Sequence, residues 1–332
     1  MRNKFSIIVC CIFGFITSCQ SPEKKSSMES EPEYMEDFIQ SDNVKIHYLD
    51  WGGSGQPIVL IHGLGDTPYI FQDLASSLKN NFRIIAYSKR GHYKSEASNA
   101  QYDIDELVSD LKLLVDSLQI NKVNLLGWSM GGNEITEFAI RYPDRTNKLI
   151  YLEAGYDLSD KEFGIIFKSL PQSVLPSPKD LQSLDSYRKW YHNLWFPDIE
   201  WNETLESNLQ ASVLVNKDGS ITTIPDDSIS KLILDSGMSY QREYDRIAAP
   251  ALIIYAAPFF YPPDQNPETV KLYESLENDL ISKWRINSIN RIRSEFKNAT
   301  IIEMSKGSHA SLIFSSRDSL IKSISSFLLD KN

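Results

Sequence analysis

Residues 125–132 read Leu125-Leu126-Gly127-Trp128-Ser129-Met130-Gly131-Gly132, an apolar run that leads directly into the pattern G-x-S-x-G. Residues 123–126 predict a strand buried on both faces, and residues 130–141 have helical spacing. A serine between a strand and a helix needs small neighbours, because the chain turns so sharply there that side chains would collide. The turn holds the hydroxyl clear of the sheet, beside a helix N-terminus that favours negative charge. We therefore expect Ser129 to be a nucleophile.

The residues on both sides of this turn alternate between strand-like and helix-like patterns. Patterns typical of strands recur at 44–51, 57–61, 82–87, 149–152, 251–255 and 300–304. Helical spacing covers 69–78, 104–118, 280–296 and 319–329. Strands that alternate with helices pair in parallel through right-handed crossovers. The predicted fold class is therefore α/β, with a mostly parallel central sheet flanked by helices.

The alternation stops after Glu153 and resumes near residue 251. We interpret 155–250 as a helical cap inserted after the sixth strand, and 38–154 with 251–332 as one core that shares a sheet. The insertion carries aromatic residues at near-helical spacing, which either form an apolar substrate pocket or pack the cap onto the core. These residues are Tyr187, Trp190, Tyr191, Trp195 and Phe196.

The composition excludes several classes of protein. The chain has 332 residues, a net charge of −10 and 42% hydrophobic residues, which is enough apolar content for a sizeable core. An acidic chain without a Lys/Arg cluster does not suggest nucleic-acid binding. All three cysteines precede residue 20, so the body holds no disulfide and no Cys nucleophile. Scattered histidines and the absence of a glycine-rich phosphate motif predict no metal and no cofactor.

The N-terminus has the pattern of an exported bacterial lipoprotein. Arg2 and Lys4 make the first residues positively charged, and residues 5–16 are almost wholly apolar. This apolar run is shorter than a transmembrane helix requires. The run ends in Ile16-Thr17-Ser18-Cys19, which resembles a lipobox. We predict a signal peptide at 1–18 and a flexible tether at 19–37. We also predict that Cys19 is lipidated and anchors the protein to a membrane, on the periplasmic side or at the cell surface. An ordinary cleaved signal or an uncleaved anchor stays open.

Four segments in order resemble the α/β-hydrolase superfamily, over roughly residues 43–329. One of them is the G-x-S-x-G turn itself, which is the third along the chain. Ile61-His62-Gly63-Leu64-Gly65-Asp66 resembles the H-G loop after the third strand. Lys89-Arg90-Gly91-His92-Tyr93-Lys94-Ser95 resembles the R-G-x-G-x-S turn, with Tyr93 in place of the usual glycine. Gly307-Ser308-His309 follows the last strand, where the family keeps its catalytic histidine.

The resemblance implies roles for individual residues. Ser129 would be the nucleophile and His309 the base that takes its proton. The backbone N–H groups of Leu64 and Met130 would form the oxyanion hole.

Three acidic residues are candidates for the acid that completes the triad. The family usually places an Asp after the seventh strand, but here the next acid after residue 255 is Asp264. A minority of the family keeps the acid at the end of the sixth strand, where this chain has Glu153 and Asp157. A carboxylate at the end of a strand reaches the active edge of the sheet, so we favour Glu153. Asp264 and Asp157 stay open.

The sequence therefore predicts a serine hydrolase that acts on a small or medium carboxylic ester through an acyl-enzyme intermediate. The same triad also fits amide or peptide hydrolysis, lactone opening and perhydrolysis. An aminopeptidase would need cap acids for a substrate ammonium, for which Asp185, Asp198, Glu200 and Glu203 are available. A surface lipoprotein that uses the fold only for binding is the alternative outside enzymes.

Overall fold

A sheet of eight strands runs through the residues that this computed structural model describes, which are 33–40, 44–97, 102–171 and 174–330. The predicted signal peptide at 1–18, Cys19 and the tether as far as residue 32 lie outside the described residues. Among the described helices, none is both long enough and apolar enough to cross a membrane.

The strand order in the sheet is β1-β2-β4-β3-β5-β6-β9-β10. Every neighbouring pair is parallel except β1 with β2 and β2 with β4. This arrangement confirms the predicted fold class. The strands are β1 (Met35–Gln40), β2 (Lys45–Gly52), β3 (Pro57–Ile61), β4 (Arg83–Tyr87), β5 (Val123–Trp128), β6 (Thr146–Leu152), β9 (Ala251–Ala256) and β10 (Ala299–Met304).

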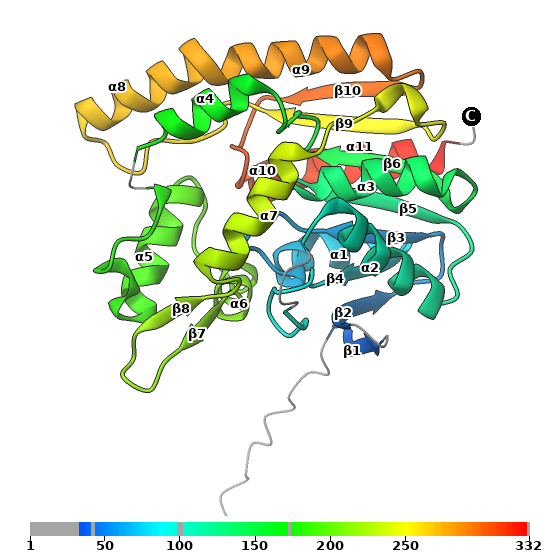
Figure 1. The fold of residues 1–332 in the computed structure, drawn as a ribbon, viewed down its shortest axis with the longest axis horizontal. Coiled ribbons are helices and arrows are strands. Elements are labelled where there is room, and N and C mark those ends of the chain that lie inside the picture. The colour runs from blue at the N-terminus through cyan, green and yellow to red at the C-terminus, as the bar shows by residue number, and fades with distance from the viewer. Residues whose placement is uncertain (1–32, 41–43, 98–101, 172–173, 331–332) are drawn as a thin grey trace, which may run out of the picture. The chain divides into compact units, whose positions relative to one another are not determined.

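Helices cover both faces of the sheet, because successive side chains of a strand point to opposite faces. In β3, Val59 packs into one core cluster and Leu60 into the other. The first cluster lies under α2, α3 and α9, and the second under α1 and α11 (Figure 1). The helices of the core are η1 (Pro68–Phe71), α1 (Gln72–Leu78), α2 (Ile104–Ser117), α3 (Gly131–Arg141), η2 (Pro143–Arg145), α8 (Pro267–Ser275), the π-helix η6 (Leu276–Ile281), α9 (Ser282–Glu295), α10 (Leu312–Ser315) and α11 (Arg317–Leu329).

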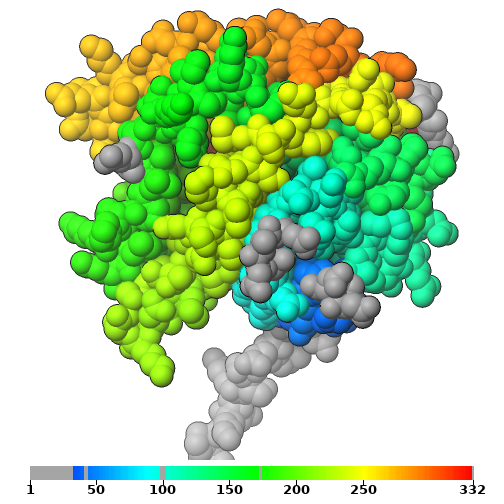
Figure 2. Space-filling view, viewed as in Figure 1, coloured from blue at the N-terminus to red at the C-terminus, as the bar shows by residue number. Residues whose placement is uncertain are grey.

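The insertion leaves the sheet after β6 and returns in β9, the strand next to β6. It contains a short antiparallel hairpin that the sequence did not predict, because β7 and β8 have only three residues each. Its elements are α4 (Lys161–Ser169), η4 (Asp180–Gln182), α5 (Leu184–Trp195), α6 (Glu203–Ala211), β7 (Val213–Val215), β8 (Ile221–Thr223), α7 (Asp227–Ser239) and η5 (Tyr244–Arg246). In the space-filling view, the yellow-green surface of α7 lies against the cyan surface of the core (Figure 2).

The aromatic residues of α5 pack the cap onto the core. Tyr187, Tyr191 and Phe196 are buried in the same cluster as the strand residues of the second face. Phe196 makes an edge contact with Phe314 of α10, and Trp195 contacts Phe260 after β9. Of the two interpretations of this aromatic stripe, these contacts favour packing.

The predicted tether at 19–37 is too long at its C-terminal end. Residues 35–37 already belong to β1, which pairs antiparallel with β2 from Met35 opposite Asp50 to Gln40 opposite Lys45. Ile39 is the only buried residue of β1. An edge strand is held by backbone hydrogen bonds to one neighbour, so the continuous apolar run that marks the inner strands is absent.

Candidate active site

Ser129 sits at the turn between β5 and α3 with φ of 53°. This left-handed backbone is strained for a residue other than glycine, at a cost of about 1–3 kcal/mol. Packing enforces the turn, since a Cβ on Gly127 would lie 2.5 Å from the carbonyl oxygen of Gly131. The Ser129 amide donates to the carbonyl of Leu152 in β6 at 3.2 Å. The serine is thereby fixed at the carboxyl ends of two neighbouring parallel strands.

His309 reaches Ser129 from the loop that follows β10. Its Nε2 lies 2.9 Å from Ser129 Oγ. The backbone of His309 is held twice, because its amide donates to the carbonyl of Phe259 at 2.9 Å and its carbonyl accepts from Trp128 Nε1 at 3.1 Å. The Phe259 ring stacks on the imidazole with centroids 4.1 Å apart and an interplanar angle of 13°. These contacts fix both the position and the plane of the ring.

Glu153 is the acid that the structure places against the imidazole. It follows β6 directly, has φ of 47° and is fully buried. Its Oε2 lies 2.9 Å from His309 Nδ1, and its Oε1 accepts from the Ala256 amide at 2.5 Å. A carboxylate beside Nδ1 keeps the proton on that nitrogen, so Nε2 is left to accept the proton of Ser129.

The other oxygen of Glu153 begins a chain of buried polar groups. Tyr156 Oη donates to Glu153 Oε1 at 3.4 Å and accepts from Arg285 Nε at 3.1 Å. Arg285 in turn pairs with Glu277 at 2.7 Å. Burial raises the pKa of Tyr156 well above its ordinary value, so the phenol stays neutral and remains a donor to the carboxylate.

The two alternative acids lie in turns and make other contacts. Asp264 is exposed, and its Oδ1 accepts from the Asn266 amide at 3.0 Å. Asp157 accepts from the Ser159 amide at 2.9 Å and pairs with Arg291. The structure therefore brings Ser129, His309 and Glu153 together and places Asp264 and Asp157 in other hydrogen-bond networks.

Two neutral histidines hold the loop after β3. This loop carries Leu64, which the resemblance predicts as an oxyanion-hole donor. His62 Nδ1 donates to the Gly63 carbonyl at 2.7 Å, and its Nε2 accepts from the Lys89 amide at 3.1 Å. His92 Nε2 accepts from the Gly65 amide at 3.3 Å. Burial lowers the pKa of His62 well below its ordinary value and that of His92 to about 3, so both rings keep the neutral form that can accept.

The held loop lies beside the nucleophile. The position that a Cβ on Gly63 would take is 3.2 Å from Ser129 Cβ. Leu64 is the next residue, and Met130 follows Ser129 at the start of α3. Within the described residues, neither the Leu64 amide nor the Met130 amide donates to a protein acceptor. Both N–H groups therefore remain available to a ligand oxygen.

The turn after β4 carries Tyr93 where the R-G-x-G-x-S pattern has a glycine. Tyr93 has φ of 45°, the left-handed region that favours glycine. The turn is held nonetheless, because Arg90 Nε and Nη2 bind Asp110 at 2.7 Å each and Ser95 Oγ donates to the Ser88 carbonyl at 2.6 Å. This turn carries His92 to the loop after β3.

Asp66 is a second carboxylate beside Ser129, and the sequence patterns assign it no role. Its Oδ1 accepts from Asn208 Nδ2 at 3.0 Å and from Tyr191 Oη at 3.2 Å, both in the cap. Burial raises its pKa to about 6, while these hydrogen bonds and the charge of His309 lower it. A polar side chain in a loop at the predicted site is the signal that could have singled it out.

The cap acids available to an aminopeptidase make other contacts or face solvent. Asp198 accepts from Ser311 at 2.9 Å and Ser315 at 2.7 Å, and Asp185 pairs with Arg188. Glu200 and Glu203 are exposed. In the described part of the chain, no three His, Cys, Asp or Glu side chains are grouped so that they could hold a metal ion.

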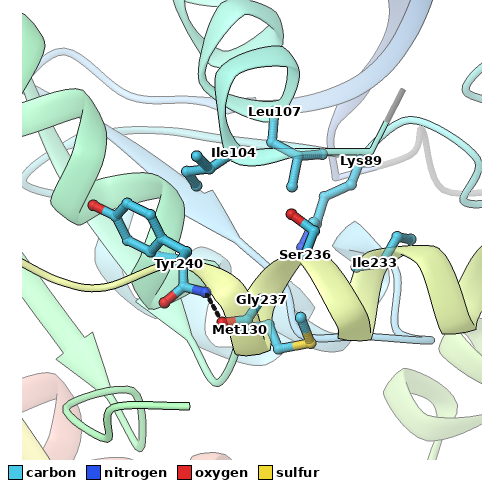
Figure 3. A pocket seen from close by; sticks show the side chains of 9 residues that line it. Lys89, Ile104, Leu107, Met130, Ile233, Ser236, Gly237 and Tyr240 are labelled. Carbon is cyan, nitrogen blue, oxygen red and sulfur yellow. Dashed lines mark hydrogen bonds between the residues drawn. The ribbon is translucent and has the colours of Figure 1, made fainter. Parts of the chain in front are cut away.

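A small cavity lies next to Met130, where the cap meets the core (Figure 3). Its free volume of about 10 Å³ is the size of a single water. Residues of α2 and α7 face one another across it. It is lined by Lys89, Ile104, Leu107, Met130, Asn133, Ile233, Ser236, Gly237 and Tyr240. The cap thus packs directly on the residue that follows Ser129.

Comparisons with known proteins bear on the family and the fold of the chain. A sequence model of the family described as alpha/beta hydrolase fold matches residues 56–315. The chain is 28% identical to human epoxide hydrolase 4 over 164 residues, which cover 48% of this chain and 42% of that protein. It is 30% identical to 3-oxoadipate enol-lactonase 2 of Acinetobacter baylyi over 130 residues, which cover 39% of this chain and 49% of that protein. The chain thus spans less than half the length of these curated relatives.

Among solved structures, the chain is similar to E-2-(acetamidomethylene)succinate hydrolase, with a TM-score of 0.64 and 16% identity. That match covers 89% of this chain and 99% of the other. At this identity the similarity shows the fold alone.

Proposed function

The chain belongs to the α/β-hydrolase family, and we propose that it is a serine hydrolase of small or medium carboxylic esters, with Ser129, His309 and Glu153 as its triad. The observation that carries the proposal is the pair of 2.9 Å contacts that join Glu153 to His309 and His309 to Ser129. This succession of contacts from acid to imidazole to hydroxyl is what nucleophile activation requires.

In the first half of the reaction, Ser129 Oγ attacks the ester carbonyl while His309 Nε2 takes the hydroxyl proton. The amides of Leu64 and Met130 donate to the oxygen that becomes negative, and the helix dipole of α3 adds to their effect. Glu153 orients the imidazolium and stabilises its charge. The intermediate collapses to an acyl-enzyme as His309 gives its proton to the departing alcohol.

In the second half, water attacks the acyl-enzyme. His309 takes a proton from the water, and the same two amides hold the second tetrahedral oxyanion. Collapse of this intermediate releases the carboxylic acid and returns the proton to Ser129 Oγ. The chain's own residues supply every proton transfer in this scheme.

A lactone is the second substrate class that we consider, and the relative named 3-oxoadipate enol-lactonase 2 favours it. Ring opening uses the same acyl transfer, with the alcohol still attached to the acyl group. The relatives named epoxide hydrolase carry less weight for this chain. Attack of Ser129 on an epoxide would form an ether, which water could not cleave to regenerate the serine.

The test compares p-nitrophenyl esters, lactones and amino-acid amides on the full-length protein and its variants. We expect Ser129→Ala to lower kcat by at least about 10⁴-fold and Glu153→Gln by about 10²–10⁴-fold. Asp264→Asn is the matched control and should retain wild-type rates. Full activity in Ser129→Ala would overturn the mechanism, and loss of activity only in Asp264→Asn would overturn the choice of acid. Cleavage of amides without esters would assign an aminopeptidase-like activity instead.

We also propose that the protein is exported and anchored through a lipid on Cys19, on the strength of the sequence pattern at 1–19. Growth of expressing bacteria with an alkyne-bearing fatty acid should label the wild type and not Cys19→Ala. Equal labelling of both proteins would contradict the lipid anchor.

A further inference from the structure

Asp66 lies close enough to Ser129 to touch a bound substrate. The point that a Cβ on Gly63 would take is 3.6 Å from Asp66 Oδ2 and also 3.6 Å from Ser129 Oγ. The two oxygens are therefore no farther apart than twice that distance. A substrate bound at Ser129 needs to extend only a few atoms beyond its carbonyl carbon to span that distance.

The two oxygens of Asp66 are used differently. Oδ1 accepts from Asn208 and Tyr191 of the cap. Asn208 is itself fixed, because its own oxygen accepts from the amide and the hydroxyl of Thr67 at 2.9 and 2.7 Å. Within the described residues, Oδ2 accepts no hydrogen bond, and it is not sealed from solvent. The carboxylate is thus held by one oxygen and presents the other beside the nucleophile.

An acceptor held in this way discriminates between ligands. A ligand with a hydroxyl or ammonium group can donate to the free oxygen, whereas an apolar ligand excludes solvent from that oxygen and leaves it unpaired. The pKa of Asp66, about 6, keeps its carboxyl group ionised in neutral solution. An ionised carboxylate accepts stronger hydrogen bonds than a neutral one.

We propose that Asp66 is a specificity-determining residue, which accepts a hydrogen bond from a hydroxyl or ammonium group that the substrate carries a few bonds from the scissile carbonyl. This inference rests on the proposed ester hydrolysis at Ser129. It narrows the substrate class to esters or lactones with such a donor near the reacting group.

The test measures kcat/KM for matched p-nitrophenyl esters, namely butanoate, 3-hydroxybutanoate and 3-aminobutanoate, together with butanoate esters that carry the same groups on the alcohol. We expect the wild type to prefer at least one donor-bearing ester over its plain counterpart by about 10-fold or more. Asp66→Asn should lower that ratio at least about 10-fold, because the amide offers a donor where Oδ2 accepts. An ammonium preference weakens with added salt, whereas a hydroxyl preference does not.

Asp185→Asn is the matched control, since it removes a cap carboxylate that pairs with Arg188. Its ratio should equal that of the wild type. A wild type that hydrolyses plain esters but prefers no donor-bearing ester overturns the role of Asp66, and this result does not depend on how any variant folds. An unchanged ratio in active Asp66→Asn overturns it as well. Absence of all ester hydrolysis by the wild type would instead refute the proposed function.

Discussion

Ser129 and Glu153 share an unusual backbone conformation. Both are non-glycine residues with positive φ, 53° and 47°, and each directly follows a strand of the parallel pair β5 and β6. Strained residues of this kind persist only where the surrounding structure over-determines them, and they gather at functional sites. The sheet hydrogen bonds and the buried contacts of Glu153 supply that constraint. The strain thus supports the two roles independently of the side-chain distances.

At the scale of single residues, the raised pKa of Asp66 has a cost in stability. Its ordinary value is 3.8, and burial raises it to about 6 in the folded protein. Between these values the folded state binds a proton that the unfolded state has lost, so the free energy of unfolding falls as pH rises through this window. The loss is at most about 3 kcal/mol.

Asp66→Asn lacks this titration. We therefore expect its free energy of unfolding, relative to the wild type, to increase between about pH 4 and about pH 7. Urea denaturation across this range measures the difference. A difference that does not vary with pH would show that Asp66 titrates normally in the folded protein.

Sequence reasoning selected residues that the structure brings together where their place depends on chain position, and it missed a residue whose surroundings depend on contacts across the chain. Ser129, His309 and Glu153 each follow a strand, and parallel strands end at one edge of a sheet, so their place in the chain predicts that they lie near one another. Asp264 and Asp157 also follow strands, so chain position alone does not select the acid. Asp66 owes its environment to Asn208 and Tyr191, which lie more than a hundred residues away. No pattern of neighbouring residues in the sequence predicts such a contact.

At the scale of elements, the inner strands were predictable because burial on both faces leaves continuous apolar runs. β3 spans Pro57–Ile61, the same residues that the pattern indicates. The helix predicted at 280–296 is longer in the structure, because α8, η6 and α9 form an unbroken helical stretch from Pro267 to Glu295. Most residues of α8 and η6 are polar or exposed, so the apolar periodicity of this part of the stretch is weak.

Helix α7 offers a test of how the cap bears on the nucleophile turn. A Cβ on Gly237 would lie 2.5 Å from Met130 Cε, whereas one on Gly164 of α4 meets nothing within 4 Å. We expect Gly164→Ala to raise the free energy of unfolding by about 0.5–1 kcal/mol through helix propensity. Gly237→Ala should raise the free energy of unfolding by less and should also lower kcat, because the displaced side chain belongs to Met130, whose amide we propose for the oxyanion hole.

Thermal unfolding and ester kinetics on the two glycine variants measure these effects side by side. Equal stabilisation by the two substitutions, with kcat unchanged in both, would show that α7 does not constrain Met130.

At the scale of the whole molecule, the cap and the core share one apolar interior. Cap residues Tyr191 and Phe196 belong to the same cluster as Leu126 of β5 and Ile254 of β9. An insertion that is buried in this way cannot unfold without exposing the second face of the sheet. We therefore expect a single cooperative unfolding transition for the cap and the core together.

Phe196→Ala tests this continuity, because the side chain is 1% exposed at the junction of cap and core. It should lower the free energy of unfolding by about 3–5 kcal/mol and keep one transition. Leu175→Ala in the cap is the control, because that side chain is 69% exposed and its loss should matter by less than about 0.5 kcal/mol. Two separate transitions by calorimetry would show that the cap is an independent folding unit.

Trp128 gives the proposed site an optical reporter of its own. Its indole nitrogen donates to the His309 carbonyl at 3.1 Å, and its ring centroid lies 6.4 Å from that of the imidazole. Fluorescence emission from an indole responds to the charge of a ring so near to it. The difference in emission between the wild type and Trp128→Phe isolates this one fluorophore among the six tryptophans of the chain. A change in the surroundings of the imidazole can thus be followed by fluorescence in the unlabelled protein, before any substrate is known.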